Sequence, residues 1–155
     1  MTDVYRRAAS ILVIKPVEDS YHILLLHKPR KKDAWQLPQG GVEGEENVTQ
    51  AALRELNEEA SLKDCNVLGV SPRFYQYDFP DSYRRFRPDN VKGQHISFVF
   101  ALAPMDAAVT VDEKEVDSYV WIDVAQLGQY LKRDEYLNLV KGLYEEALKA
   151  LNAKH

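Results

Sequence analysis

Three glutamates, Glu55, Glu58 and Glu59, lie in a segment that predicts one amphipathic helix, Val48–Ala60, and they constrain the fold more than any other feature. Their spacing of i, i+3 and i+4 places all three carboxylates on one side of that helix. The apolar residues that pack the helix against the rest of the chain are Ala51, Ala52 and Leu56. Carboxylates this close repel one another, and a hard cation such as Mg²⁺, which prefers oxygen ligands, removes the repulsion. The acidic face of an isolated helix is usually a solvated surface. The neighbouring sequence therefore has to show whether this face binds a metal ion.

The charge and cysteine content exclude several broad classes of protein. The formal net charge is -4, which argues against a chain that coats nucleic acid through bulk positive charge. Cys65 is the only cysteine, so no intrachain disulfide forms and a reducing compartment fits best. No apolar run approaches the ~20 residues that cross a membrane, and the N-terminus lacks a secretory pattern. We therefore expect a cytoplasmic protein without membrane contact.

The rest of the chain predicts an α/β fold. Two apolar runs, Ala8–Lys15 and Tyr21–His27, are separated by turn residues and predict a hairpin. Alternating or apolar patterns predict further strands over Arg73–Phe79, His95–Leu102 and Tyr119–Ile122. Helices are predicted over Val124–Leu131 and Glu135–Leu151, the second from apolar residues at helical spacing. No repeat or linker divides the chain, so we expect a single domain over 1–155 with a mixed sheet between helices.

The segment Gly40–Leu62 resembles the Nudix box, Gly-x5-Glu-x7-Arg-Glu-aliphatic-x-Glu-Glu-x-Gly-aliphatic. The residues that match this pattern are Gly40, Glu46, Arg54, Glu55, Leu56, Glu58, Glu59 and Leu62. Ser61 stands where the box has glycine; we expect positive φ there, at a cost on the order of 1 kcal/mol. The resemblance implies a Nudix-type α/β/α sandwich that hydrolyses a phosphoanhydride bond with Mg²⁺, for which Mn²⁺ could substitute.

The same resemblance implies roles for individual residues. Metal ligation falls to Gly40, through its backbone, and to Glu55, Glu58 and Glu59. Glu46 and Arg54 pair and hold the loop to the helix. The attacking water loses its proton to Glu55 or to a carboxylate from another loop.

Sequence outside the box resembles bacterial RNA pyrophosphohydrolases and dinucleoside polyphosphate hydrolases. The similar stretches are WQLPQGG before the box and YDFP, KGQHISFVF and EVDSYVW after it. The last stretch implies Glu115 as a fourth metal carboxylate, on a loop facing the helix. Arg6, Lys28 and Gln39 are implied as substrate contacts. A second basic segment, SYRRFRP, interleaves aromatic rings with Arg84, Arg85 and Arg87, a composition suited to stacking bases while holding a phosphate backbone.

These observations predict a nucleotide or a 5′-triphosphorylated RNA as the substrate, and they leave a homodimer open. Two alternatives remain. One is a small-molecule triphosphate pyrophosphohydrolase acting on dihydroneopterin triphosphate or on free nucleoside triphosphates, which the opening VYRRAASILVI also resembles. The other is a catalytically silent Nudix module that binds nucleotide as a sensor. The complete set of carboxylates argues against the sensor.

Overall fold

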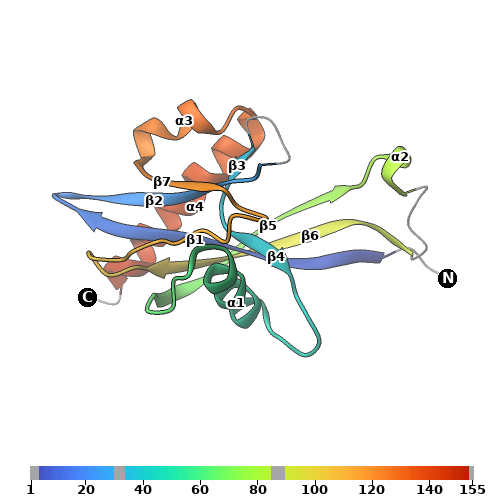
Figure 1. Cartoon of the computed structure of the whole chain (residues 1–155), viewed down its shortest axis with the longest axis horizontal. Helices are drawn as coiled ribbons and strands as arrows, with labels where there is room; N and C mark the ends of the chain where they lie inside the picture. Colours follow the sequence, from blue (N-terminus) through green and yellow to red (C-terminus); the bar gives the residue numbers. More distant parts are fainter. Residues whose placement is uncertain (1–3, 30–33, 85–89, 154–155) are drawn as a thin grey trace.

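A seven-stranded mixed sheet forms the centre of the molecule in a computed structural model that describes residues 4–29, 34–84 and 90–153. The strands run in the order β3-β2-β1-β6-β5, with β4 added to β1 and β7 added to β2 (Figure 1). Their bounds are Val4–Val17 (β1), Ser20–His27 (β2), Trp35–Gln36 (β3), Gln39–Gly41 (β4), Asn66–Asp78 (β5), Val91–Leu102 (β6) and Ser118–Asp123 (β7).

The pairing of the long strands makes the sheet mixed. β1 runs parallel to β6, while the pairings of β1 with β2 and of β5 with β6 are antiparallel. The predicted hairpin is confirmed, because Val17 pairs with Ser20 across a two-residue turn in which Glu18 has a φ of 55°. Two parallel strands need a crossover connection. The chain between β1 and β6, which includes helix α1 (Val48–Ala60), supplies it.

Helices cover both faces of the sheet, as Figure 1 shows with α1 on one side and α3 and α4 on the other. The helical segments are α1 (Val48–Ala60), α2 (Asp81–Arg84), the short 3₁₀ turn η1 (Val124–Gln126), α3 (Leu127–Tyr130) and α4 (Asp134–Ala153). Successive residues of β1 point to opposite faces: Leu12 and Ile14 pack on the α4 side, and Ile11 and Val13 on the α1 side. Burial on both faces explains why β1 and β2 read as continuous apolar runs.

The predicted fold class is confirmed: an α/β/α sandwich around a mixed sheet. The predicted helix Val48–Ala60 has the bounds of α1, and the segment Val124–Leu131 is divided between η1 and α3. The short strands β3 and β4 and the helix α2 were not predicted, since two to four residues carry no periodic pattern. No helix of the described ranges is long and apolar enough to cross a membrane.

Both ends of α1 are capped, and the positive φ predicted at Ser61 is confirmed. Asn47 accepts a hydrogen bond from the Gln50 backbone N–H at 2.8 Å, and the Gln50 side chain accepts one from the Asn47 N–H at 2.9 Å. This capping box starts the helix at Val48. Ser61 ends it in the left-handed region, with a φ of 57°, and its hydroxyl donates to the Thr110 carbonyl at 3.0 Å. The serine thus gains a hydrogen bond that a glycine would lack.

Candidate active site

The three glutamates of α1 lie at three different depths. Glu55 and Glu58 line a cleft of about 1400 Å³ that opens between α1, the ends of β5 and β6, and the segment between α3 and α4. Glu58 is the most open of the three, with 57% of its side chain exposed. Glu59 lies beneath them, with 1% exposed. We use the name carboxylate cluster for Glu55, Glu58, Glu59 and Glu115.

Arg54 ties the start of the box to the carboxylate cluster. Its Nε donates to Glu46 Oε2 at 2.7 Å, its Nη2 donates to the Gly41 carbonyl at 2.7 Å, and its Nη1 donates to Glu55 Oε1 at 2.8 Å. The hydrogen bond from Arg54 lowers the pKa of Glu46, and the same contact raises the pKa of Arg54. One guanidinium therefore fixes the loop before α1 and the orientation of Glu55.

Glu59 is held by two donors from the strands. Lys28 Nζ lies 2.5 Å from Glu59 Oε2, and the Gln39 backbone N–H donates to Oε1 at 3.1 Å. Burial raises the pKa of Glu59, and Lys28 opposes that shift. Lys28 and the Gln39 side chain also line the cleft, so both predicted substrate contacts lie at its wall. The ammonium of Lys28 is, however, engaged by Glu59 in this structure.

The two glycines of β4 allow side chains to lie against the backbone. A Cβ at Gly40 would collide with the carboxylate of Glu55, and a Cβ at Gly41 would collide with the guanidinium of Arg6. A larger residue at either position would displace the carboxylate of Glu55 or the guanidinium of Arg6 from where it now lies. Arg6, a predicted substrate contact, is thereby placed at the cleft wall beside the carboxylate cluster.

The segment before Gly40 is anchored by one hydrogen bond to helix α4 and one to strand β1. The Tyr136 hydroxyl of α4 accepts a hydrogen bond from the Leu37 N–H at 3.0 Å. Ser10 of β1 donates from its hydroxyl to the Pro38 carbonyl at 3.1 Å. Burial raises the pKa of Tyr136 to about 12, so this hydroxyl stays protonated at neutral pH. Neither anchor was identified from the sequence, because both act across long chain separations.

Glu115 reaches the same cleft from the loop before β7. Burial raises the pKa of Glu55, and the negative charges of Glu58 and Glu115 act in the same direction, while Arg54 opposes them. The structure thus brings Glu115 close enough to Glu55 for their charges to interact. Glu55, Glu58 and Glu115 line one cleft, and Glu59 is buried next to them.

The carboxylate cluster has the donor chemistry of a Mg²⁺ site. All of its side-chain donors are oxygens, and the glycine backbone lies against the carboxylate of Glu55. Among the residues that the structure describes, no three acidic, histidine or cysteine side chains form a ready metal site as they stand. Arg54 and Lys28 hold oxygens of Glu55 and Glu59 instead. The residues fit the ion by chemistry, with cationic side chains balancing the charge.

The rest of the cleft is lined by rings and further cations. Tyr75 and Tyr77 of β5 and Phe98 of β6 form what we call the aromatic wall. Gln94 donates to the Tyr77 hydroxyl at 2.6 Å, and the rings of Tyr75 and Tyr77 meet edge to face. The cations that line the cleft and were not singled out from the sequence are Lys114, Lys132 and Arg133. Their segments carry no motif, so only the fold reveals them.

The second basic segment, SYRRFRP, lies partly outside the residues that the structure describes. Arg85 and Arg87 lie outside the described residues, and so does the side chain of Arg84. Their predicted contact with substrate stays a prediction.

Comparison with known proteins agrees with this geometry. A family model described as NUDIX domain matches residues 4–142. An RNA pyrophosphohydrolase of Ruthia magnifica subsp. Calyptogena magnifica is 31% identical over 135 residues, covering 83% of this chain and 73% of that relative. Among solved structures, a C. elegans Ap4A hydrolase binary complex has a TM-score of 0.72 at 18% identity, covering 97% of this chain and 99% of the other. The E. coli dihydroneopterin triphosphate pyrophosphohydrolase has a TM-score of 0.68 at 24% identity, covering 90% and 97%.

The chain therefore belongs to the Nudix family. It is a Nudix hydrolase, an enzyme class that acts on acid anhydride bonds and generally uses a divalent metal such as Mg²⁺.

Proposed function

We propose that this enzyme removes pyrophosphate from the 5′ end of triphosphorylated RNA, with Mg²⁺ as its cofactor. The observation that carries the proposal is the cleft, which joins the carboxylate cluster to the aromatic wall. Its volume of about 1400 Å³ exceeds the ~300–1000 Å³ typical of small-molecule pockets. A cleft of this size has room for more than a single nucleotide. The relatives named RNA pyrophosphohydrolase support the same substrate.

The carboxylate cluster would hold the metal, together with the Gly40 backbone. When bound, the ion supplies positive charge against the phosphate oxygens. Arg54 and Glu46 keep the glycine loop and Glu55 in register, since three donors of one guanidinium are engaged between them. Glu55 is one candidate to take the proton of the attacking water, because its carboxylate lines the cleft beside the Gly40 backbone. Glu115 is the other candidate for this role.

The substrate would lie along the cleft with its phosphates at the carboxylate cluster. Arg6, Lys28 and Lys114 border that end and supply positive charge for a polyphosphate. Within the aromatic wall, the half-buried rings of Tyr75 and Tyr77 offer faces on which bases stack, an interaction worth ~1–3 kcal/mol per base, while Phe98 is buried. Arg84, Arg85 and Arg87 are proposed to contact phosphates further along the RNA.

A side-by-side product analysis tests this function. Triphosphorylated RNA, a nucleoside triphosphate, a dinucleoside tetraphosphate and dihydroneopterin triphosphate are each incubated with the enzyme and Mg²⁺ at equal concentration. We expect 5′-monophosphorylated RNA and pyrophosphate to form fastest, and EDTA to abolish the reaction. Much faster cleavage of either small triphosphate would replace the RNA assignment with the small-molecule alternative. Binding without any cleavage would support the silent sensor.

A further inference from the structure

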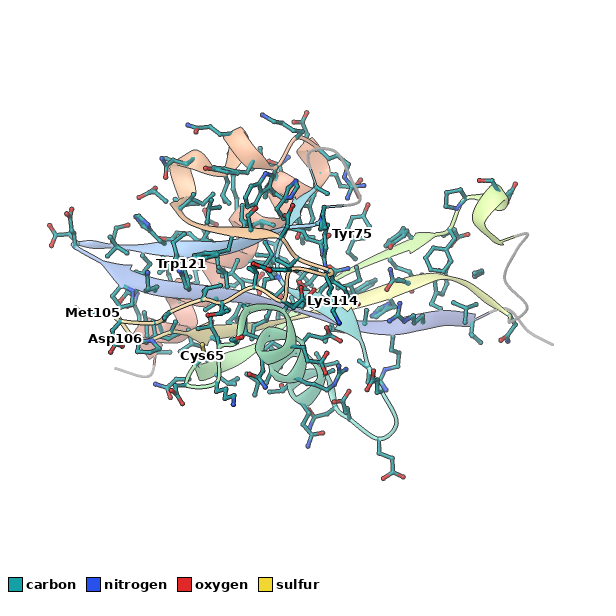
Figure 2. All side chains as sticks on the ribbon, viewed as in Figure 1. Cys65, Tyr75, Met105, Asp106, Lys114 and Trp121 are labelled. Atoms are coloured by element: carbon teal, nitrogen blue, oxygen red, sulfur yellow. The ribbon has the colours of Figure 1, made fainter. Side chains whose placement is uncertain are left out.

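The loop that carries Glu115 lies outside the helices and strands. Glu115 is exposed, and the residues on either side of it, Lys114 and Val116, differ sharply in burial: Lys114 is exposed and Val116 is fully buried. Burial of its own side chain therefore does not fix the place of the Glu115 carboxylate. Figure 2 labels Lys114, which lines the cleft from this loop, and Tyr75, which lines it from β5. Contacts other than burial of the Glu115 side chain therefore have to hold the loop against the cleft.

One carboxylate oxygen gathers the backbone of this loop. Asp112 Oδ1 accepts hydrogen bonds from three successive N–H groups, those of Lys114 at 3.1 Å, Glu115 at 3.1 Å and Val116 at 3.0 Å. The Glu113 N–H closes the loop from the other side by donating to the Val116 carbonyl at 2.8 Å. Glu113 itself has a φ of 65°, a conformation that a non-glycine residue keeps only where its surroundings impose it. The loop is thus wound around the Asp112 side chain and pinned by buried Val116.

We propose that Asp112 is a positioning residue that fixes Glu115 opposite α1. Three backbone hydrogen bonds converge on one oxygen of Asp112. Because the Glu115 N–H is one of the three, the backbone from which the Glu115 side chain projects is held directly. Asp112 acts on the metal site through Glu115, as groups that orient a ligand do in other metal sites. The inference rests on the proposed role of Glu115 as a metal ligand.

The test measures metal binding rather than turnover. The whole chain is titrated with MnCl₂, and free Mn²⁺ is counted by electron paramagnetic resonance. Loss of a group that orients a ligand typically weakens metal binding by ~10–100-fold. We expect Asp112→Ala to weaken Mn²⁺ binding at least ~10-fold, as Glu115→Gln does. The double variant should bind no worse than the weaker single variant, because residues that act through one another are not additive.

Two further variants separate positioning from charge. Asp112→Asn keeps an oxygen that can accept the three N–H bonds but removes the charge, so Mn²⁺ binding should stay within ~2-fold of wild type if geometry is what matters. Asp106→Ala is the matched control: Asp106 is also an exposed loop aspartate, and Figure 2 shows it well away from Lys114. It should leave binding unchanged. Melting curves accompany every titration, and if Asp112→Ala fails to fold, Asp112→Ser, which offers a weaker acceptor, takes its place and should lie between alanine and wild type.

Three results would overturn the inference while leaving the proposed function in place. They are wild-type Mn²⁺ binding in Asp112→Ala, additive losses in the double variant, and an Asp112→Asn variant as weak as the alanine variant. The last would show that the charge of Asp112 matters rather than its hydrogen bonds. If Glu115→Gln itself binds Mn²⁺ like wild type, the proposed role of Glu115 as a metal ligand, on which the inference rests, is wrong.

Discussion

The two ends of the cleft are held in different ways. At the carboxylate cluster, Glu55 is oriented by Arg54, and Glu59 is fixed by Lys28 and a backbone N–H. Along the aromatic wall, the contacts are ring packing and one bond, from Gln94 to the Tyr77 hydroxyl. The first end is a charge-assisted network with defined geometry, and the second is a set of ring faces that tolerates different ligands. We propose that the carboxylate cluster, the chemical end of the cleft, performs the chemistry and that the aromatic wall, the selective end, selects the substrate.

Glu59→Gln should cause the largest loss of turnover, because it alters the carboxylate cluster. It removes the charge of a carboxylate that we propose as a metal ligand, so turnover should fall at least ~100-fold, a loss of about 3 kcal/mol in transition-state stabilisation. Steady-state kinetics at saturating Mg²⁺ with triphosphorylated RNA measures it, and circular dichroism checks the fold. Glu58→Gln is the matched comparison, since Glu58 is far more exposed and should lose less. A Glu59→Gln enzyme with near-normal turnover would remove Glu59 from the metal ligands.

Replacing Arg84, Arg85 and Arg87 together by alanine should weaken the preference for RNA over a free nucleotide. RNA carries phosphates beyond the bond that is cut, and contacts to them weaken with salt, whereas a free nucleotide offers fewer such contacts. We expect the KM for RNA to rise roughly tenfold and its salt dependence to flatten, with a smaller change for a nucleoside triphosphate. Parallel KM measurements at two salt concentrations check this. Equal losses on both substrates would move these arginines to the leaving phosphates or to the fold.

The difference in stability between Glu59→Gln and wild type should depend on pH in a way that reports on Glu59. Burial raises the pKa of Glu55 and Glu59 above the ordinary value of 4.5, so the folded, metal-free protein binds protons more tightly than the unfolded chain. Their contribution to stability is therefore present below pH 4.5 and is lost as pH rises through the raised pKa values. In EDTA, the Tm of Glu59→Gln minus the Tm of wild type should therefore increase as the pH rises through this range. A difference that stays constant with pH would contradict the pKa shift of Glu59.

Ser61 offers the smallest effect, at the end of the helix that carries the cluster. Ser61→Gly relieves the left-handed strain but loses the hydrogen bond to the Thr110 carbonyl, so its stability should stay close to wild type. Ser61→Ala loses the same bond and keeps the strain. We expect the glycine variant to be the more stable by about 1 kcal/mol in urea unfolding, with activity unchanged in both. Equal stabilities would mean that the strain at this position is negligible.

The same contrast explains how far the sequence could predict this molecule. The box lies in one continuous segment, so spacing alone placed Glu55 and Glu59 on one helix side and positive φ at Ser61. The opposite wall is assembled from strands and loops far apart in the chain. Lys132 and Arg133 carry no motif, Tyr136 acts on Leu37 across the fold, and Asp112 acts through backbone bonds. The first three become visible only once the tertiary structure brings their segments together, whereas Asp112 becomes visible from the local conformation of its own loop.

Division of labour between the two ends is tested most directly by a length series. Triphosphorylated substrates of one, two, three and five nucleotides are compared by kcat/KM, in wild-type enzyme and in Glu59→Gln. If the cleft binds nucleotides beyond the first, kcat/KM should rise with length and then level off, and Glu59→Gln should lower every member by the same factor. A series that is flat, or that falls with length, would contradict an RNA-selecting wall. A Glu59→Gln loss that changes with length would contradict the separation of chemistry from selection.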